Sequence, residues 1–120
     1  MLNKGVRSEE DRRIESIVMK LSSIGFLPED KEHQVLVDEE LKKLGLSFEV
    51  LRVMPEEALC EHLVKVNFSW ERMEEFADLL VQWSVKDIVF KSKGKMLYEF
   101  IQKASKSFSF ERMQKISKLK

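Results

Sequence analysis

The residues of this chain best suited to chemistry are a cysteine and a histidine two positions apart, Cys60 and His62. A nucleophilic cysteine needs a base within hydrogen-bond reach, and usually a third group that orients the base. Side chains two apart on a helix point in different directions, so His62 is poorly placed to activate Cys60. Cys60 also lies beside Leu59 and near Leu63, where a small thiol packs well. We therefore expect a buried structural cysteine, no catalytic residue, and a protein that is not an enzyme.

A metal centre is not expected either, because the chain has only two histidines and one cysteine, too few for a zinc site. Glu29 and Asp30 precede His33 by four and three residues. Carboxylates at the start of a helix more often cap it and offset its dipole than bind a metal. The sequence contains no glycine-rich phosphate loop and no H-E-x-x-H or G-x-S-x-G motif. We expect no bound metal and no cofactor.

Charge is separated along the chain, although the formal net charge is zero. Residues 1–90 hold 12 Lys and Arg against 19 Asp and Glu, a net charge of −7, whereas residues 91–120 hold 9 against 2, a net charge of +7. A basic segment of this kind can contact nucleic acid or another anionic surface. We favour the alternative that it packs beside the acidic remainder or is solvated, because no known nucleic-acid motif accompanies it. The basic residues concerned are Lys91, Lys93, Lys95, Lys103, Lys106, Arg112, Lys115, Lys118 and Lys120.

Composition predicts that helices position these residues. The chain has 120 residues, of which 43% are hydrophobic and 35% charged, enough for one core with a charged surface. Four glycines and two prolines are too few for the many tight turns of an all-β domain. We therefore expect an all-α fold, with a loose N-terminal segment at residues 1–7 and a single all-helical domain at residues 8–120.

Cysteine usage and hydropathy predict where the protein resides. One cysteine cannot form a disulfide within the chain, and residues 1–8 lack the apolar core of a signal peptide. No window approaches the roughly 18 consecutive apolar residues of a membrane span. We expect a cytoplasmic protein with no membrane contact.

Capping residues and helical periodicity predict six or seven helices. The clearest begins with Ser8 and Asp11, carries an apolar stripe from Ile14 to Ile24, and ends before Gly25, which gives a helix over residues 8–24. The other expected helices cover about residues 29–44, a short stretch from Ser47, stretches opened by Pro55 and Ser69, residues 84–104 with Ser84 and Asp87 as a start, and Ser109 to about Lys118. Gly94 leaves open whether residues 84–104 form one helix or two.

One segment of the chain is repeated at an offset of 40 residues. Residues 67–76 read N-F-S-W-E-R-M-E-E-F, and residues 107–116 read S-F-S-F-E-R-M-Q-K-I. In each copy the serine can cap a helix, the preceding phenylalanine can staple onto the first turn near Met73 or Met113, and the glutamate lies at the positive end of the dipole. Because capping does not require the shared Arg-Met, either a true repeat of a helix pair or two similar helix starts can explain the pattern.

A 40-residue period with two helices per unit is typical of α-helical repeats. Gly94, Tyr98 and Ile101 have the spacing G-x-x-x-Y-x-x-I, which resembles the second helix of a tetratricopeptide repeat. The first-helix pattern of that family is absent in register, and Lys106 stands where the family has a closing proline. Residues 69–118 thus resemble a divergent TPR-like arrangement, which implies an irregular antiparallel stack of helices and a role in protein interaction.

Function is therefore expected to lie in contact with another protein rather than in catalysis. Trp70 and its counterpart Phe110 lie in the first turns of their helices, where an aromatic side chain can anchor a partner. Arg72 and Arg112 complete the candidate contact residues. A second copy of the chain is also a candidate partner, because a two-unit stack leaves its end faces uncovered. Nucleic-acid binding through residues 91–120 remains the alternative.

Overall fold

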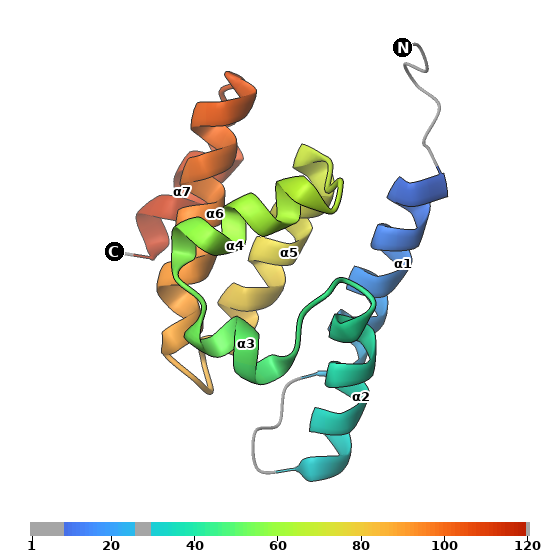
Figure 1. Cartoon of the computed structure of the whole chain (residues 1–120). Coiled ribbons are helices and arrows are strands. Elements are labelled where there is room, and N and C mark those ends of the chain that lie inside the picture. The colour runs from blue at the N-terminus through green and yellow to red at the C-terminus, as the bar shows by residue number, and fades with distance from the viewer. Residues whose placement is uncertain (1–8, 26–29, 120) are drawn as a thin grey trace.

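The computed structural model describes residues 9–25 and 30–119, and across these residues it contains seven α-helices and no strand (Figure 1). The all-α prediction is thereby confirmed. The predicted loose segment at residues 1–7 and the Ser8 cap lie outside the described residues, as do residues 26–29. The helices are α1 (Glu9–Ile24), α2 (Lys31–Lys42), α3 (Phe48–Val53), α4 (Glu56–Lys65), α5 (Trp70–Trp83), α6 (Val89–Ser105) and α7 (Phe110–Lys118).

Serine caps set the start of three helices, as the sequence predicts. The Oγ atom of Ser47 accepts a hydrogen bond from the backbone N–H three residues on, at 3.1 Å, and those of Ser69 and Ser109 do so at 3.2 Å. Each bond satisfies one of the free N–H groups of a first turn. Helix α2 starts two residues later than predicted, at Lys31, where the Asp30 side chain accepts from the N–H of Glu32.

The predicted start at Ser84 is wrong. Ser84 ends α5, and its hydroxyl donates to the carbonyl of Val81 at 2.6 Å instead of capping a new helix. Asp87 takes the capping role, since its carboxylate accepts from the N–H of Val89 at 3.3 Å. From Val89 the chain runs as one uninterrupted helix through Gly94 to Ser105, which answers the question that the sequence leaves open.

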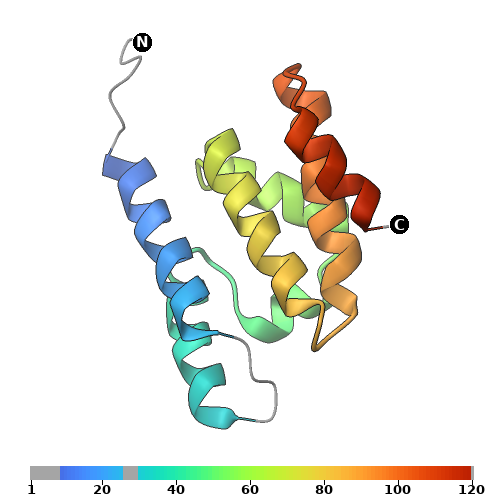
Figure 2. The same cartoon turned by 180° about the vertical axis from the view of Figure 1, so that it is seen from behind.

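Helices α5 and α6 form the centre of the molecule and make its most extensive helix contact. Figures 1 and 2 show α1 and α2 side by side at one edge, α4 crossing α6, and α7 at the opposite edge. Gly94 allows the close approach of α5 and α6, because a Cβ atom at this position would lie 2.8 Å from Val81 Cγ2 and 3.2 Å from the carbonyl oxygen of Ala77.

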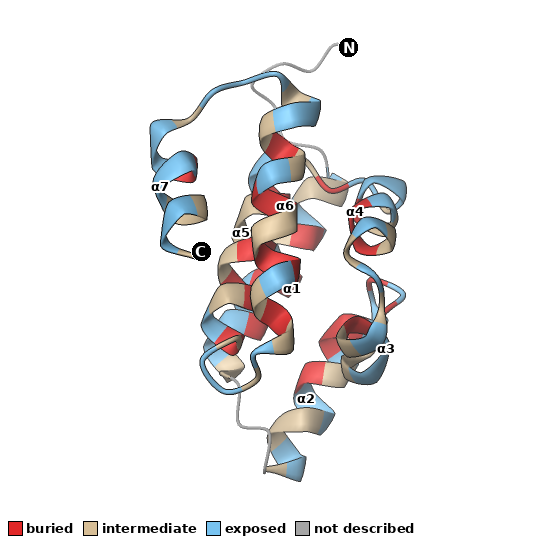
Figure 3. Ribbon diagram, turned by 90° about the vertical axis from the view of Figure 1, so that its left-hand side faces the viewer, coloured by how far each residue is buried: buried red, intermediate tan, exposed pale blue. Residues whose placement is uncertain are grey.

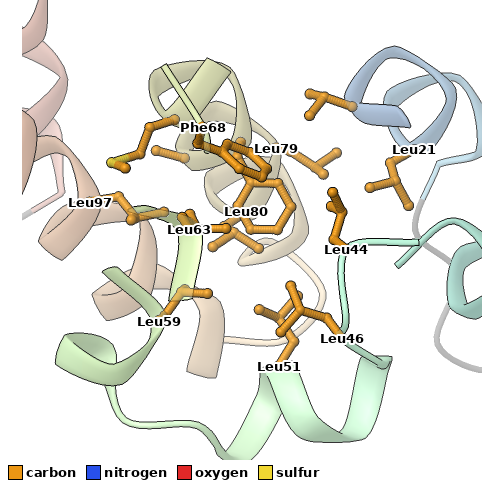
Figure 4. Packing of buried hydrophobic residues seen from close by; sticks show 14 of the residues in the cluster. Leu21, Leu44, Leu46, Leu51, Leu59, Leu63, Phe68, Leu79, Leu80 and Leu97 are labelled. Carbon is orange, nitrogen blue, oxygen red and sulfur yellow. The ribbon is translucent and has the colours of Figure 1, made fainter. Parts of the chain in front are cut away.

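Buried side chains from α1 to α6 form one continuous core, part of which is shown in Figure 4. Trp83, Phe90 and Tyr98 are all almost fully buried. Helix α7 differs from the rest, because Arg112 is its one buried residue and most of its surface is exposed (Figure 3). The molecule therefore has a packed centre and a helix attached at its edge.

The residues that carry the tetratricopeptide resemblance lie together in α6. Gly94, Tyr98 and Ile101 are buried, and Gly94 lies directly against α5. This placement is compatible with many helix pairs, so the family assignment stays a prediction.

Candidate partner-contact surface

Cys60 and His62 point in different directions on α4, and the fold also gives them different surroundings. Cys60 is buried in α4, and burial, assisted by the nearby carboxylates, raises the pKa of its thiol to about 11. The thiol is therefore protonated at neutral pH and is a poor nucleophile. The Nε2 atom of His62 lies 2.7 Å from the carbonyl oxygen of Leu44, so its ring links α4 to the end of α2.

No cluster of three or more His, Cys, Asp or Glu residues arranged for a metal ion occurs in residues 9–25 and 30–119. His33 contacts one carboxylate, with its Nδ1 atom 2.7 Å from Oδ2 of Asp30, the cap of its own helix. Among the helices described, none is long and apolar enough to cross a membrane.

The first copy of the repeated segment fastens α5 to α1. Arg72 is buried, and its Nη1 atom lies 2.7 Å from Oε2 of Glu15. Ser69, besides capping α5, donates from its hydroxyl to Oδ1 of Asp11 at 3.0 Å. Burial disfavours the charged guanidinium, but the Glu15 hydrogen bond and the acidic groups nearby outweigh it, so the pKa of Arg72 is raised. Arg72 thus holds two helices together and presents almost no surface.

The second copy fastens α7 to α5 in a related way. The Nε atom of Arg112 donates to Oε1 of Glu74 at 3.0 Å, and its Nη1 atom donates to Gln102 and to the carbonyl of Ser107. Lys115, one turn along α7, donates to Oε2 of Glu74 at 2.9 Å. The arginine of each copy therefore binds a carboxylate on a helix that precedes it in the chain.

Ionisation of the groups between α5 and α7 is shifted toward the charged forms. Burial opposes the charge on Glu74, but hydrogen bonds from Lys115 and Arg112 outweigh it and lower its pKa. Burial likewise opposes the charge on Lys115, and hydrogen bonds to Glu74 and Asp78 outweigh it and raise its pKa. Buried Tyr98 donates to Asp78, and burial followed by this hydrogen bond raises the pKa of the phenol. At neutral pH α7 is therefore held by a charged network.

Aromatic side chains, by contrast, are exposed beside this network. Trp70 is 40% exposed, with its ring centroid 6.2 Å from that of Phe100, and Phe110 is 67% exposed. Phe108 is 73% exposed, which does not fit the predicted staple against the first turn of α7. Its counterpart Phe68 is buried, with its ring edge-on to Phe76 at 5.7 Å. The two copies share five of ten residues, yet Phe68 and Phe108 have opposite environments.

One of the exposed aromatics, Trp70, lines a hollow, and the other two lie in the chain segment that borders it. The hollow encloses about 230 Å³ and is lined by Trp70, Glu71, Glu74, Ser105, Ser107 and Arg112. Phe108 directly follows Ser107, and Phe110 opens α7 two residues before Arg112. We call Trp70, Phe108 and Phe110 the aromatic end. The structure thus brings the predicted Trp70, Phe110 and Arg112 to one region, while Arg72 lies between α1 and α5.

The basic C-terminal segment is partly used inside the fold. Lys93 is buried and its Nζ atom donates to the carbonyl of Met54 at 2.5 Å. Arg112 and Lys115 are paired with Glu74. Lys120 lies outside the described residues. Five of the nine basic residues are thus left at the surface with no ion pair inside the described ranges: Lys91, Lys95, Lys103, Lys106 and Lys118.

Sequence reasoning missed the carboxylates that fix the two arginines. Glu15 and Glu74 lie 57 and 38 residues from Arg72 and Arg112, so no local spacing connects them. The one available signal was the shared Arg-Met, which helix capping does not explain. Comparison with known protein families, with curated protein sequences and with solved structures finds no match to this chain.

Proposed function

We propose that this chain is a non-enzymatic interaction domain that binds another protein through its aromatic end. The observation that carries the proposal is the exposure of Trp70, which lines the hollow, and of Phe108 and Phe110, which lie near its lining residues Ser107 and Arg112 in the chain. Single exposed apolar residues are common on soluble proteins, but a group of large ones marks a contact site. Aromatic residues also dominate the binding energy of protein interfaces.

The support for these aromatics favours binding. Arg112 is held by Glu74, Gln102 and the backbone of Ser107. These bonds fix the start of α7, and with it Phe110, against α5 and α6. A surface that is already ordered loses less conformational entropy when a partner binds.

The distribution of the basic residues gives less support to nucleic-acid binding. Lys93, Arg112 and Lys115 are committed to contacts within the fold. Phosphate contacts made by the remaining lysines would respond strongly to salt, because binding would release counterions. An apolar contact would respond weakly, and this difference separates the two functions in an experiment.

The test is affinity capture from a lysate of the source organism with matched surface variants. Phe108→Ser/Phe110→Ser removes two members of the aromatic end, and Val85→Ser/Ile88→Ser removes two side chains that are 83% and 72% exposed in the loop between α5 and α6. We expect a protein that survives nuclease and moderate salt to be reduced about tenfold or more by the first variant. The loop variant is expected to retain it.

Two results would contradict the proposal. Retention of the same protein by Phe108→Ser/Phe110→Ser would show that the aromatic end is not the contact. Capture that disappears with nuclease and salt would instead support nucleic-acid binding through residues 91–120.

A further inference from the structure

Helix α7 has an inner side, which holds it to α5, and an exposed outer face on the opposite side. Its inner side carries Arg112 and Lys115 in the charged network, with Ile116 and Leu119 packed against the core. Its outer face consists of four residues with exposed side chains: Phe110, Met113, Gln114 and Ser117. Phe110 and Met113 are 67% and 43% exposed, so this face is apolar at one end and small and polar at the other.

Two opposite charges flank the outer face of α7. Glu111 lies in the first turn and Lys118 in the last turn, and both are exposed. Residues seven apart lie on the same side of a helix, about 10 Å apart along its axis. Within residues 9–25 and 30–119 neither side chain makes an ion pair. The helix thus carries a negative charge in its first turn and a positive charge in its last, along one edge of an apolar face.

We propose that the outer face of α7 binds the outer face of α7 in a second copy of this chain, with the two helices antiparallel about a two-fold axis. In this arrangement the same edge of both helices meets, as in antiparallel coiled coils. Glu111 of each copy then faces Lys118 of the other, so one pairing gives two ion pairs. In this register the large Phe110 lies two residues, about 3 Å along the axis, beyond the small Ser117 of the second copy, which leaves room for its ring.

Charge and size set the expected strength of this dimer. The formal net charge of the chain is zero, so two copies do not repel each other as a whole. Helix α7 has nine residues, so the pair buries less than the roughly 1,200–2,000 Å² of a standard interface. We therefore expect a dissociation constant in the micromolar range. The dimer is a separate property from the proposed function. Phe110 belongs both to the aromatic end and to the outer face of α7, so the test of the dimer changes Glu111 and Lys118 instead.

The experiment is analytical ultracentrifugation of the full chain at low ionic strength, over about a hundredfold range of concentration. Wild-type chain is expected to form a dimer. Glu111→Lys and Lys118→Glu each place like charges opposite one another twice, and each is expected to weaken the dimer about tenfold. Mixing these two variants restores both opposite-charge pairs, so the mixture is expected to form a heterodimer. The double variant Glu111→Lys/Lys118→Glu is expected to dimerise as well.

The mixture separates pairing from damage to the helix. Both substitutions oppose the α7 dipole, and fraying caused by this would not be reversed by mixing. A wild-type chain that stays monomeric at every concentration, single variants that dimerise like wild type, or a mixture that stays monomeric would each overturn the dimer. None of these results bears on capture through Trp70 and Phe108, so the proposed function would stand.

Discussion

At the scale of single residues, Gly94 is where one added methyl group has the largest consequence for packing. A Cβ atom there would meet Val81 Cγ2 at 2.8 Å and the carbonyl oxygen of Ala77 at 3.2 Å. The valine side chain can shift, but the carbonyl belongs to the backbone of α5 and moves only if the helix moves. Intrinsic helix propensity acts in the other direction, since alanine is favoured over glycine by about 1 kcal/mol.

We predict that Gly94→Ala destabilises the protein by about 1–2 kcal/mol, because the cost of overpacking exceeds the gain in helix propensity. The measurement is urea unfolding followed by circular dichroism. Lys103→Ala, at an exposed position of the same helix, is the control and should change stability by no more than about 0.5 kcal/mol. A Gly94→Ala protein at least as stable as wild type would mean that α5 and α6 are less closely packed.

At the scale of elements, α7 depends on charge more than the central helices do, although Ile116 and Leu119 also pack against the core. Its one buried side chain is Arg112, and its contact with α5 runs through Glu74, Lys115 and Asp78. Most other helices here contribute several buried apolar residues. A helix held in this way depends on the ionisation of its partners, whereas the central pair α5 and α6 depends on apolar burial.

We predict that Glu74→Gln releases α7 while the core stays folded. The substitution removes the carboxylate that accepts from both Arg112 and Lys115. Amide exchange in α7, measured by mass spectrometry at neutral pH, is expected to rise about tenfold, with α5 and α6 unchanged. Glu71→Gln, at an exposed acid of the same helix, is the matched control. Equal protection of α7 in both variants would contradict the prediction.

The pH dependence of the α7 attachment follows from the same groups. The folded-state pKa of Glu74 is lowered, so its stabilisation is present above its ordinary value of 4.5 and lost as pH falls through the folded value. That of Lys115 is raised from 10.5, so its contribution is present below 10.5 and lost as pH rises through the folded value. The attachment is therefore fully formed between about pH 5 and 10.

At the scale of the whole molecule, a buried ionic contact joins α1 to the centre. Arg72 of α5 is 2.7 Å from Glu15 of α1, and Ser69 is hydrogen-bonded to Asp11. Removing one member of a buried pair leaves the other charge poorly compensated. The first helix therefore depends on a side chain that lies nearly 60 residues further along the chain.

We predict that Arg72→Met costs about 2 kcal/mol of unfolding free energy, because it removes the buried guanidinium that lies against Glu15 and Asp11. Glu15→Gln is expected to cost less, since its side chain is 26% exposed. In a double-mutant cycle by urea unfolding, the combined variant should lose about 1 kcal/mol less than the sum of the two. Arg12→Met, at an exposed position of α1, serves as the control, and additive losses would rule out the coupling.

Much of the fold could be predicted from local signals, and most of the candidate surface could not. Ser47, Ser69 and Ser109 mark helix starts because capping acts over three residues. The helix start predicted at Ser84 is wrong because a serine hydroxyl can also donate to a carbonyl of the preceding helix, as Ser84 does to Val81. The aromatics Phe68 and Phe108 both precede a capping serine but have opposite burial. Their environments are set by which helices pack on them, and local sequence does not encode that.

The repeated segment also has a consequence for how the chain reaches its native state. Residues 67–76 and 107–116 offer the same cap, the same arginine and the same methionine, so both suit the position beside Asp11 and Glu15 of α1. During synthesis the first segment emerges before the second exists, and it docks without a rival. After dilution from denaturant both segments are present from the start. We expect refolding to select between them through the residues that differ, because Glu74 and Glu75 of the first copy stand where the second has Gln114 and Lys115.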